Sequence, residues 1–191
     1  GEYSPDANTV LLLHMNETTG STVNDASSYG NSGTATGTTV VEGRFGKARK
    51  IATTDVIRVN SSASLNFTAN DFTVECWINT QYSAAWQILV KSDPTTGFSL
   101  AYHGNAGGRV NLRLDALGTF ADAWSSDVVN DGKWHHVAGL RKNNRLEVYV
   151  DGKPQQDVER SFVGNINTTA DLYIFSGDGL VQIEQHARDS H

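Results

Sequence analysis

The sequence lacks several features, and each absence narrows the fold. Its 191 residues include one cysteine, Cys76, so an internal disulfide is excluded, and only three prolines. No apolar run reaches the roughly 20 residues that a membrane-spanning helix needs. The fifteen Lys and Arg residues are dispersed in a chain of formal net charge −6, whereas phosphate binding needs clustered basic residues. A disulfide scaffold, a membrane span and a nucleic-acid-binding surface are therefore excluded.

The sequence also lacks the pattern of a long helix, because no stretch keeps a 3.6-residue hydrophobic period. Short apolar or alternating runs are instead separated by Gly, Asn, Asp, Ser and Thr. This spacing, together with eighteen glycines, predicts an all-β fold in which two antiparallel sheets pack as a β-sandwich. The predicted strands are Val10–Met15, Val56–Val59, Phe72–Asn79, Gln87–Lys91, Phe98–Tyr102, Arg109–Leu114, Trp134–Leu140, Arg145–Val150 and Leu172–Phe175.

The clearest unit is a β-hairpin formed by Trp134–Leu140 and Arg145–Val150, with a polar turn between them. Successive strand side chains point to opposite faces, so Leu146, Val148 and Val150 are predicted to be buried together. By the same alternation His135 and His136 point to opposite faces and cannot jointly hold a metal. The hairpin is therefore predicted to be structural.

The lone cysteine is predicted to be a core residue. Cys76 alternates with Phe72, Val74 and Ile78 on one strand face, and no base stands at a recognisable catalytic spacing from it. We interpret it as a small buried hydrophobic side chain and not as a reactive thiol.

Several motifs resemble those of one family. They are Leu11–Glu17 followed by Asp25 and Ser27, Gly43–Ala48, Phe72–Ile78, Trp134–Ala138 and Leu146–Gly152. In this order they resemble the laminin-G-like group of concanavalin A-like lectin/glucanase jelly rolls, which includes pentraxin-like domains. The resemblance runs from about Val10 to Ile174 and implies a concanavalin A-like jelly roll. Most of these residues serve packing and turns, so they are specific for the fold and weak for function.

The chain is expected to be one laminin-G-like domain over residues 1–191, with an N-terminal extension at 1–8. Residues 180–191 are an atypical closing strand or tail, because the acidic residue of the family's closing motif has no aligned counterpart. Val181 and Ile183 keep a period of two, which allows a short closing strand; otherwise an unpaired edge lies beside the first strand. Ser21–Thr39 is expected to be a long ordered loop or edge excursion.

The motifs of catalytic relatives are absent. Glycanases of this fold type carry Glu-x-Asp-x-x-Glu on one strand, whereas Glu75 stands without a second acid. Glu147 and Asp151 lie too far apart along a strand for a retaining pair, and Asp151-Gly152 is typical of a turn. No clustered Arg, Gln, His and Tyr of a polysaccharide lyase is found. The protein is therefore predicted not to be an enzyme, and a glycoside hydrolase or lyase with an unrecognised site is the weakest hypothesis.

Carbohydrate binding is the favoured hypothesis. Sugars stack their C–H faces on exposed aromatic rings and bind polar side chains through their hydroxyls. Trp77 and Trp134 fall in packing motifs and are expected to be core or half-core. For the other two tryptophans, packing at the sandwich edge is the alternative to a sugar platform. The predicted ligand-binding residues are Trp86, Trp124, Tyr82, Tyr102, Arg113 and Asp115.

A structural Ca²⁺ ion is implied by the resemblance, since members of the family often bind one through oxygen ligands of the first loop and the closing strand. The matching positions are Asn16, Asp25 and Asp178, and Glu17 and Asp171 offer further oxygen ligands for the ion. Asn16 stands where an Asp is commoner in the family.

Taken together, the resemblance implies a non-catalytic glycan-binding module, secreted or at the cell surface and attached to other domains. The chain starts at Gly1 without an initiator Met, which suggests a processed or excised piece. The alternative is a protein-adhesion or assembly domain, marked by a flat apolar surface and an unpaired C-terminal edge.

Overall fold

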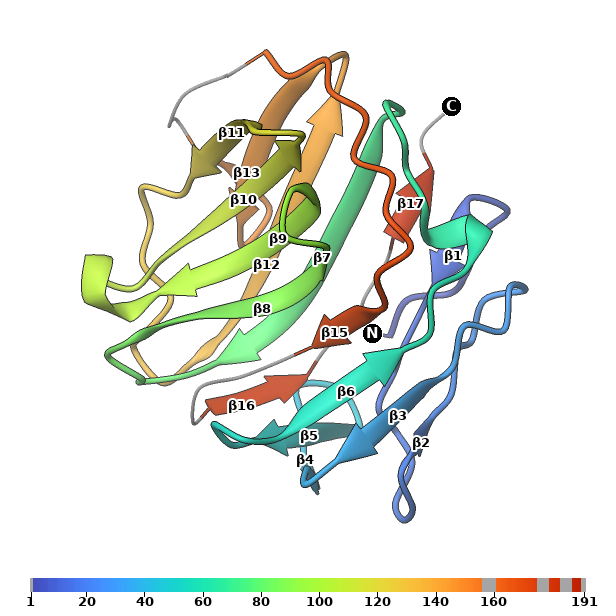
Figure 1. Ribbon diagram of the computed structural model, residues 1–191. Helices are drawn as coiled ribbons and strands as arrows, with labels where there is room; N and C mark the ends of the chain where they lie inside the picture. Colours follow the sequence, from blue (N-terminus) through green and yellow to red (C-terminus); the bar gives the residue numbers. More distant parts are fainter. Residues whose placement is uncertain (1, 156–160, 175–178, 183–186, 190–191) are drawn as a thin grey trace.

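The computed structural model describes residues 2–155, 161–174, 179–182 and 187–189. It confirms an all-β, two-sheet antiparallel sandwich (Figure 1). The nine-stranded sheet has the order β14 (Lys153–Pro154), β13 (Arg145–Val150), β12 (Trp134–Lys142), β7 (Phe72–Asn79), β16 (Gly179–Gln182), β5 (Lys47–Ile51), β4 (Thr39–Glu42), with β17 (Ala187–Asp189) pairing both β7 and β1 (Thr9–Leu11).

The eight-stranded sheet carries the central hairpins of the chain. Its order is β11 (Thr119–Trp124), β10 (Arg109–Ala116), β9 (Thr96–His103), β8 (Ala85–Ser92), β15 (Leu172–Ile174), β6 (Val56–Val59), β3 (Gly33–Thr36), β2 (Thr22–Val23). Two short 3₁₀ turns, η1 (Ala63–Leu65) and η2 (Gly104–Ala106), complete the described elements.

Most predicted strands are present. β6, β7 and β13 have the predicted bounds, β8, β9, β10 and β12 are longer than predicted, and β15 ends at Ile174, the last described residue before a gap. The predicted Val10–Met15 strand is shorter, because only an isolated Leu13–Asp25 bridge follows β1. Ser21–Thr39 does form an edge excursion, and it contains β2 and β3.

The sequence pattern did not reveal β4, β5 and β11, for reasons of composition. β5 contains three basic residues among five, and β11 places only Ala121 and Ala123 in the core. Small or charged residues give little hydrophobic alternation. Pairing with neighbouring strands, more than local sequence preference, therefore determines that these segments form strands.

The core lies between the inward faces of the sheets. Phe72, Val74, Cys76 and Ile78 of β7 alternate with half-buried residues, as predicted, and Leu146, Val148 and Val150 of β13 do the same. Opposite them, β9 and β10 supply Phe98, Leu100, Tyr102, Val110, Leu112 and Leu114. The sheets approach closely at Gly139, where an added Cβ would lie 3.0 Å from Leu112 Cβ.

Two buried cations anchor the segment that crosses from the first sheet to β15. Arg141 donates to the carbonyls of Phe162 (2.9 Å) and Gly164 (3.0 Å), and Lys91 Nζ donates to those of Thr168 and Ala170. Burial lowers the pKa of both cationic groups. These carbonyl contacts replace the water that the charges lose, and they fix a segment that has little regular structure of its own.

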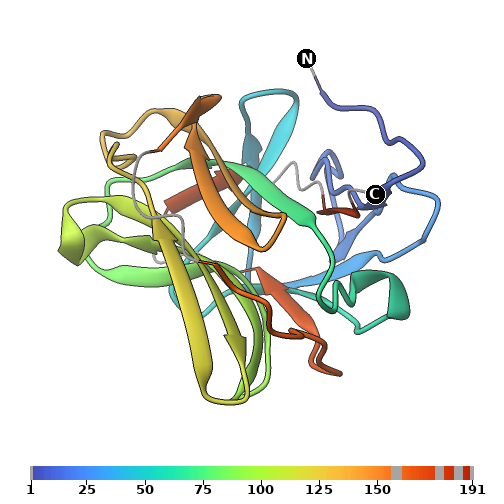
Figure 2. The ribbon, with the colours of Figure 1, turned by 90° about the horizontal axis from the view of Figure 1, so that it is seen from above.

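The C-terminal strands close the nine-stranded sheet. β16 lies between β7 and β5, and β17 lies between β7 and β1. The first and last strands are therefore neighbours, on the right of Figure 2. Val181 of the expected closing strand lies in β16, whereas Ile183 lies outside the described residues. The first strand has β17 as its neighbour, so its edge is not unpaired there.

Candidate functional site

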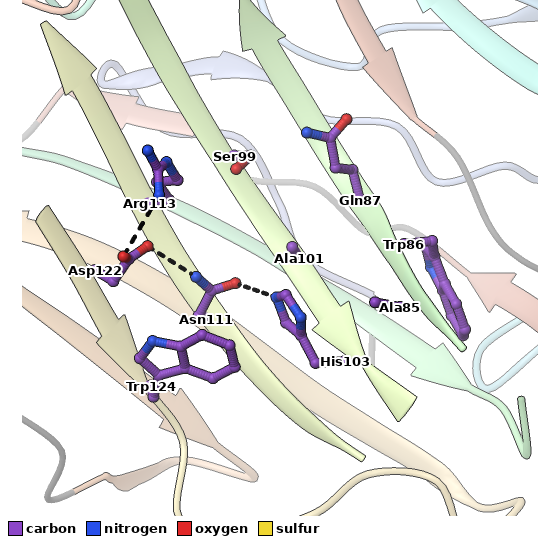
Figure 3. A pocket seen from close by; sticks show the side chains of 10 residues that line it. All are labelled: Ala85, Trp86, Gln87, Ser99, Ala101, His103, Asn111, Arg113, Asp122 and Trp124. Carbon is purple, nitrogen blue, oxygen red and sulfur yellow. Dashed lines mark hydrogen bonds and ion pairs between the residues drawn. The ribbon is translucent and has the colours of Figure 1, made fainter. Parts of the chain in front are cut away.

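The outward face of the eight-stranded sheet carries a pocket of about 290 Å³, at the small end of the roughly 300–1,000 Å³ typical of ligand sites. It forms over β8 to β11, whose alternate side chains fill the core. Figure 3 shows the lining residues: Ala85, Trp86, Gln87, Ser99, Ala101, His103, Asn111, Arg113, Asp122 and Trp124.

A hydrogen-bonded relay crosses this pocket from β9 to β11. Asn111 Nδ2 donates to Asp122 Oδ1 over 3.0 Å, and Asn111 Oδ1 lies 2.9 Å from His103 Nε2. The amide nitrogen of Asn111 donates to Asp122, so the amide oxygen of Asn111 faces His103 and accepts a hydrogen bond from it. The proton of the His103 ring is therefore assigned to Nε2. Asn111 is only 4 % exposed, so the relay fixes three polar side chains in place.

Arg113 forms the second half of the polar lining. Its Nε donates to Asp115 Oδ2 (2.9 Å) and its NH2 to Asp115 Oδ1 (2.8 Å), while NH1 lies 3.6 Å from Asp122 Oδ2. The guanidinium also lies 4.0 Å from the ring centroid of Phe120. The bond to Asp115 raises the pKa of Arg113. Arg113 is thus held rigidly by two carboxylates and one aromatic ring.

Trp124 provides the aromatic wall. It is half-buried at the end of β11, with its ring centroid 4.5 Å from that of His103 and 5.3 Å from the guanidinium of Arg109. The pocket therefore combines a fixed aromatic ring with several hydrogen-bonding groups on one rigid sheet.

The structure places some of the predicted ligand-binding residues in the pocket lining and others outside it. Trp86, Trp124 and Arg113 line the pocket, and Asp115 pairs with Arg113 just outside its lining. The ring centroid of Trp86 lies 4.1 Å from that of Tyr102 and 5.0 Å from that of Tyr82. The Nε1 atom of Trp86 is buried and has no hydrogen-bond partner among the described residues. This arrangement favours edge packing for Trp86.

One prediction at this site is wrong. Tyr102 was expected to line the cleft, but its side chain is fully buried, since Tyr102 follows Phe98 and Leu100 on the inward face of β9. Its hydroxyl donates to the carbonyl of Tyr82. Tyr82 is half-buried against Trp86 and is not among the lining residues.

Sequence reasoning missed His103, Asn111 and Asp122, together with Gln87 and Ser99. A signal for them was present. On β10, Asn111, Arg113 and Asp115 alternate with Leu112 and Leu114, which places the polar group on one face. Finding the site also required the register that sets Asn111 opposite Trp124 and next to β9.

The tryptophans and acids of the other sheet serve packing. Trp77 is half-buried, with its ring centroid 5.7 Å from that of Phe45 and 5.2 Å from that of His136. Trp134 is also half-buried, as predicted. Glu147 accepts from the Tyr149 hydroxyl over 3.0 Å.

The two histidines have separate partners. His135 lies between Asp151 (2.8 Å) and Asp131 (3.0 Å), whereas His136 Nε2 lies 3.4 Å from Glu75. The inference that they cannot share a metal is in accord with these separate partners, and Asp151 does lie in a turn, with φ of 50°.

The residues proposed for calcium have other contacts. Asp25 accepts from the backbone of Leu12, Ser27 and Asn31 and from the Ser27 hydroxyl, which organises the loop after β2. Asn16 Oδ1 accepts from Lys47 N. Asp178 lies outside the described residues. Within the described ranges, no three His, Cys, Asp or Glu side chains group as metal ligands, and calcium binding remains a prediction.

The fold and the pocket together define a jelly-roll sandwich that presents a polar and aromatic depression on one sheet. A laminin G model of the concanavalin A-like lectin/glucanases superfamily matches residues 52–182, and the chain belongs to this superfamily. The resemblance seen in the motifs is thereby confirmed. Comparison with curated proteins gives no match.

Solved structures share the fold at low sequence identity. The binding domain of Paraclostridial Mosquitocidal Protein 1 matches with a TM-score of 0.80 and 16 % identity, over 96 % of this chain and 50 % of that one. The binding domain of Botulinum Neurotoxin DC in complex with SialylT matches at 0.75 and 15 %, over 97 % and 48 %. A structure describing botulinum neurotoxin type C entry through two ganglioside molecules matches at 0.73 and 14 %, over 96 % and 48 %.

This chain therefore spans about half the length of these structures. In the described part of the chain, no helix has the length and apolar character to cross a bilayer.

Proposed function

We propose that the protein is a non-catalytic carbohydrate-binding module and that the pocket over β8 to β11 holds a sugar residue. The observation that carries this proposal is the Asn111-centred relay beside Trp124. Asp122 offers acceptor oxygens, while Gln87 and Ser99 add groups that suit sugar hydroxyls. The wall of Trp124 suits the apolar C–H face of a pyranose.

A binding role fits the pocket better than hydrolysis does. A glycosidase needs one carboxyl group that donates a proton and a second that acts as nucleophile or base. Here Asp115 and Asp122 both face the same guanidinium, and Asp122 also accepts from Asn111. These contacts hold the carboxylates as fixed acceptors, which suits recognition.

The similar structures bear on where the protein acts and on whether it is attached to other domains. The descriptions of two similar structures name SialylT and two ganglioside molecules, and the matched chains of both are about twice the length of this chain. These likenesses support a glycan-binding module that acts outside the cell or at its surface and is attached to other domains. A structural Ca²⁺ ion near Asn16 and Asp25 remains part of the proposal.

A glycan array, probed with and without a chelator, followed by titration calorimetry of the best binder, tests the proposal. Trp124→Ala is expected to weaken binding about tenfold or more, since a buried aromatic contact contributes on the order of 1.5 kcal/mol. Trp134→Ala is the matched control, because this half-buried tryptophan lies on the other sheet. No glycan binding, or equal loss in both variants, would refute the site; loss of binding with chelator would support calcium.

A second candidate is an adhesion or assembly domain. Leu117 is 85 % exposed at the tip of the β10–β11 hairpin, and Val163 is 74 % exposed. Gly164, next to Val163, lies against Ala116 at the base of the same tip. This function predicts concentration-dependent association in sedimentation velocity, abolished by Leu117→Asn with Val163→Ser, and no glycan binding.

A further inference from the structure

Charged side chains line and flank the pocket, namely Arg113, Asp122 and Asp115. Among the described residues that line the pocket, Arg113 is the one with a Lys or Arg side chain. An arginine in a sugar pocket commonly provides a two-point contact for a carboxylate. Here Asp115 already occupies that two-point edge, through Nε and NH2 at 2.9 and 2.8 Å.

The remaining parts of Arg113 are also engaged. NH1 faces Asp122 at 3.6 Å, and one face of the guanidinium lies 4.0 Å from the Phe120 ring centroid. One guanidinium against two carboxylates leaves one net negative charge beside the cavity. Arg109 lies outside the lining, donating to the Ala106 carbonyl and packing on Trp124.

We propose that this pocket selects uncharged sugars and discriminates against glycans that carry a carboxylate, such as uronic or sialic acids. The inference rests on the proposed function and names the ligand class of the same site. An incoming carboxylate meets Asp122, and the cation of the described lining, Arg113, is already paired with Asp115, whereas sugar hydroxyls can donate to the oxygens of Asp122. Asp115 is thus a specificity-determining residue, because it withholds Arg113 from anionic ligands.

The test compares neutral glycans with their carboxylated counterparts by calorimetry at pH 8 and low salt. The probe pairs are the T disaccharide with sialyl-T, and cellotetraose with tetraglucuronic acid. The wild type is expected to prefer the neutral member about threefold to fivefold, the range that a partly exposed charge pair supplies. Raising NaCl to about 0.5 M should bring the ratio towards one, because salt screens exposed charges.

Asp115→Asn frees the guanidinium of Arg113 and should move the preference towards the carboxylated member. Glu42→Gln is the matched control, because Glu42 is an exposed acid on the other sheet and its substitution changes the total charge equally. The ratio in this variant should equal that of the wild type. The salt dependence of the wild type tests the same charge effect without any substitution.

The outcomes separate the two proposals. Equal or tighter binding of the carboxylated member by the wild type overturns the selectivity and leaves carbohydrate binding intact. An Asp115→Asn ratio equal to that of the wild type overturns the role of Asp115. Absence of binding to both members and to every other arrayed glycan overturns the proposed function itself.

Discussion

Arg113 and Asp115 form a two-point ion pair within a single strand, with NH2–Oδ1 and Nε–Oδ2 distances of 2.8 and 2.9 Å. Residues two apart on a strand share a face, so the pair lies wholly on the outward side of β10. The arginine therefore supports the pocket wall, and its charge is already matched before any ligand arrives.

The relay at Asn111 should be a structural unit as well as part of the site. Asn111→Ala leaves His103 Nε2 and Asp122 Oδ1 without their present partner. We expect a loss of about 1–3 kcal/mol in the free energy of unfolding, measured by urea titration. Asn105→Ala is the control, because Asn105 is exposed in η2. Equal urea midpoints for both variants would show that the relay adds no stability.

The charged group around His135 should make stability depend on pH. Burial lowers the pKa of His135, but its bonds to Asp151 and Asp131 raise it more, so the folded value lies above the ordinary one of about 6.5. Lys133 and His135 lower the pKa of Asp131. The contribution of His135 is therefore complete below about pH 6.5 and is lost as the pH rises through the folded pKa.

The variant His135→Gln reveals this contribution. The difference in urea midpoint between wild type and variant should be larger at pH 5.5 than at pH 8.5. A direct NMR titration of the His135 imidazole should give a midpoint above the ordinary histidine value. A difference independent of pH would contradict the assignment.

The tip of the β10–β11 hairpin carries backbone strain. Leu117 and Gly118 have φ of 48° and 89°, and a two-residue turn with both φ values positive normally takes Asn-Gly. Leu117→Asn should therefore raise the free energy of unfolding by about 0.5–1 kcal/mol, since an exposed leucine loses no core contact. Leu117→Ala lacks the short polar side chain that lets Asn adopt a positive φ by bonding to nearby backbone, so it should give no comparable gain. An unchanged urea midpoint for Leu117→Asn would argue against strain at this turn.

Cys76 should be inert in the folded protein. Its side chain is fully buried in β7, and burial raises the pKa of the thiol. The thiolate is the reactive form, so labelling by a disulfide reagent at pH 8 should be negligible in the native state and complete in guanidinium chloride. Rapid native labelling would show that the core opens at this strand.

Much of the fold followed from local pattern. The alternation of β7 and β13 fixed which side chains are buried, because each strand packs one face on the core. β5 and β11 escaped prediction, since charged residues and alanines give a weak pattern. Of the proposed ligand-binding residues, Trp86, Trp124 and Arg113 line the pocket, and their binding of a ligand stays a prediction. Tyr102 instead points into the core, which its polar neighbours in sequence did not indicate.

The sequence by itself determined the strands with a clear alternation, such as β7 and β13, the buried cysteine and the separation of His135 from His136. All three depend on the two-residue period of a strand. Only the tertiary structure decided the site. His103, Asn111 and Trp124 come from three different strands, and they meet because the register of β9, β10 and β11 aligns them. Pairing between strands is a long-range interaction, so no local pattern reveals which outward side chains become neighbours.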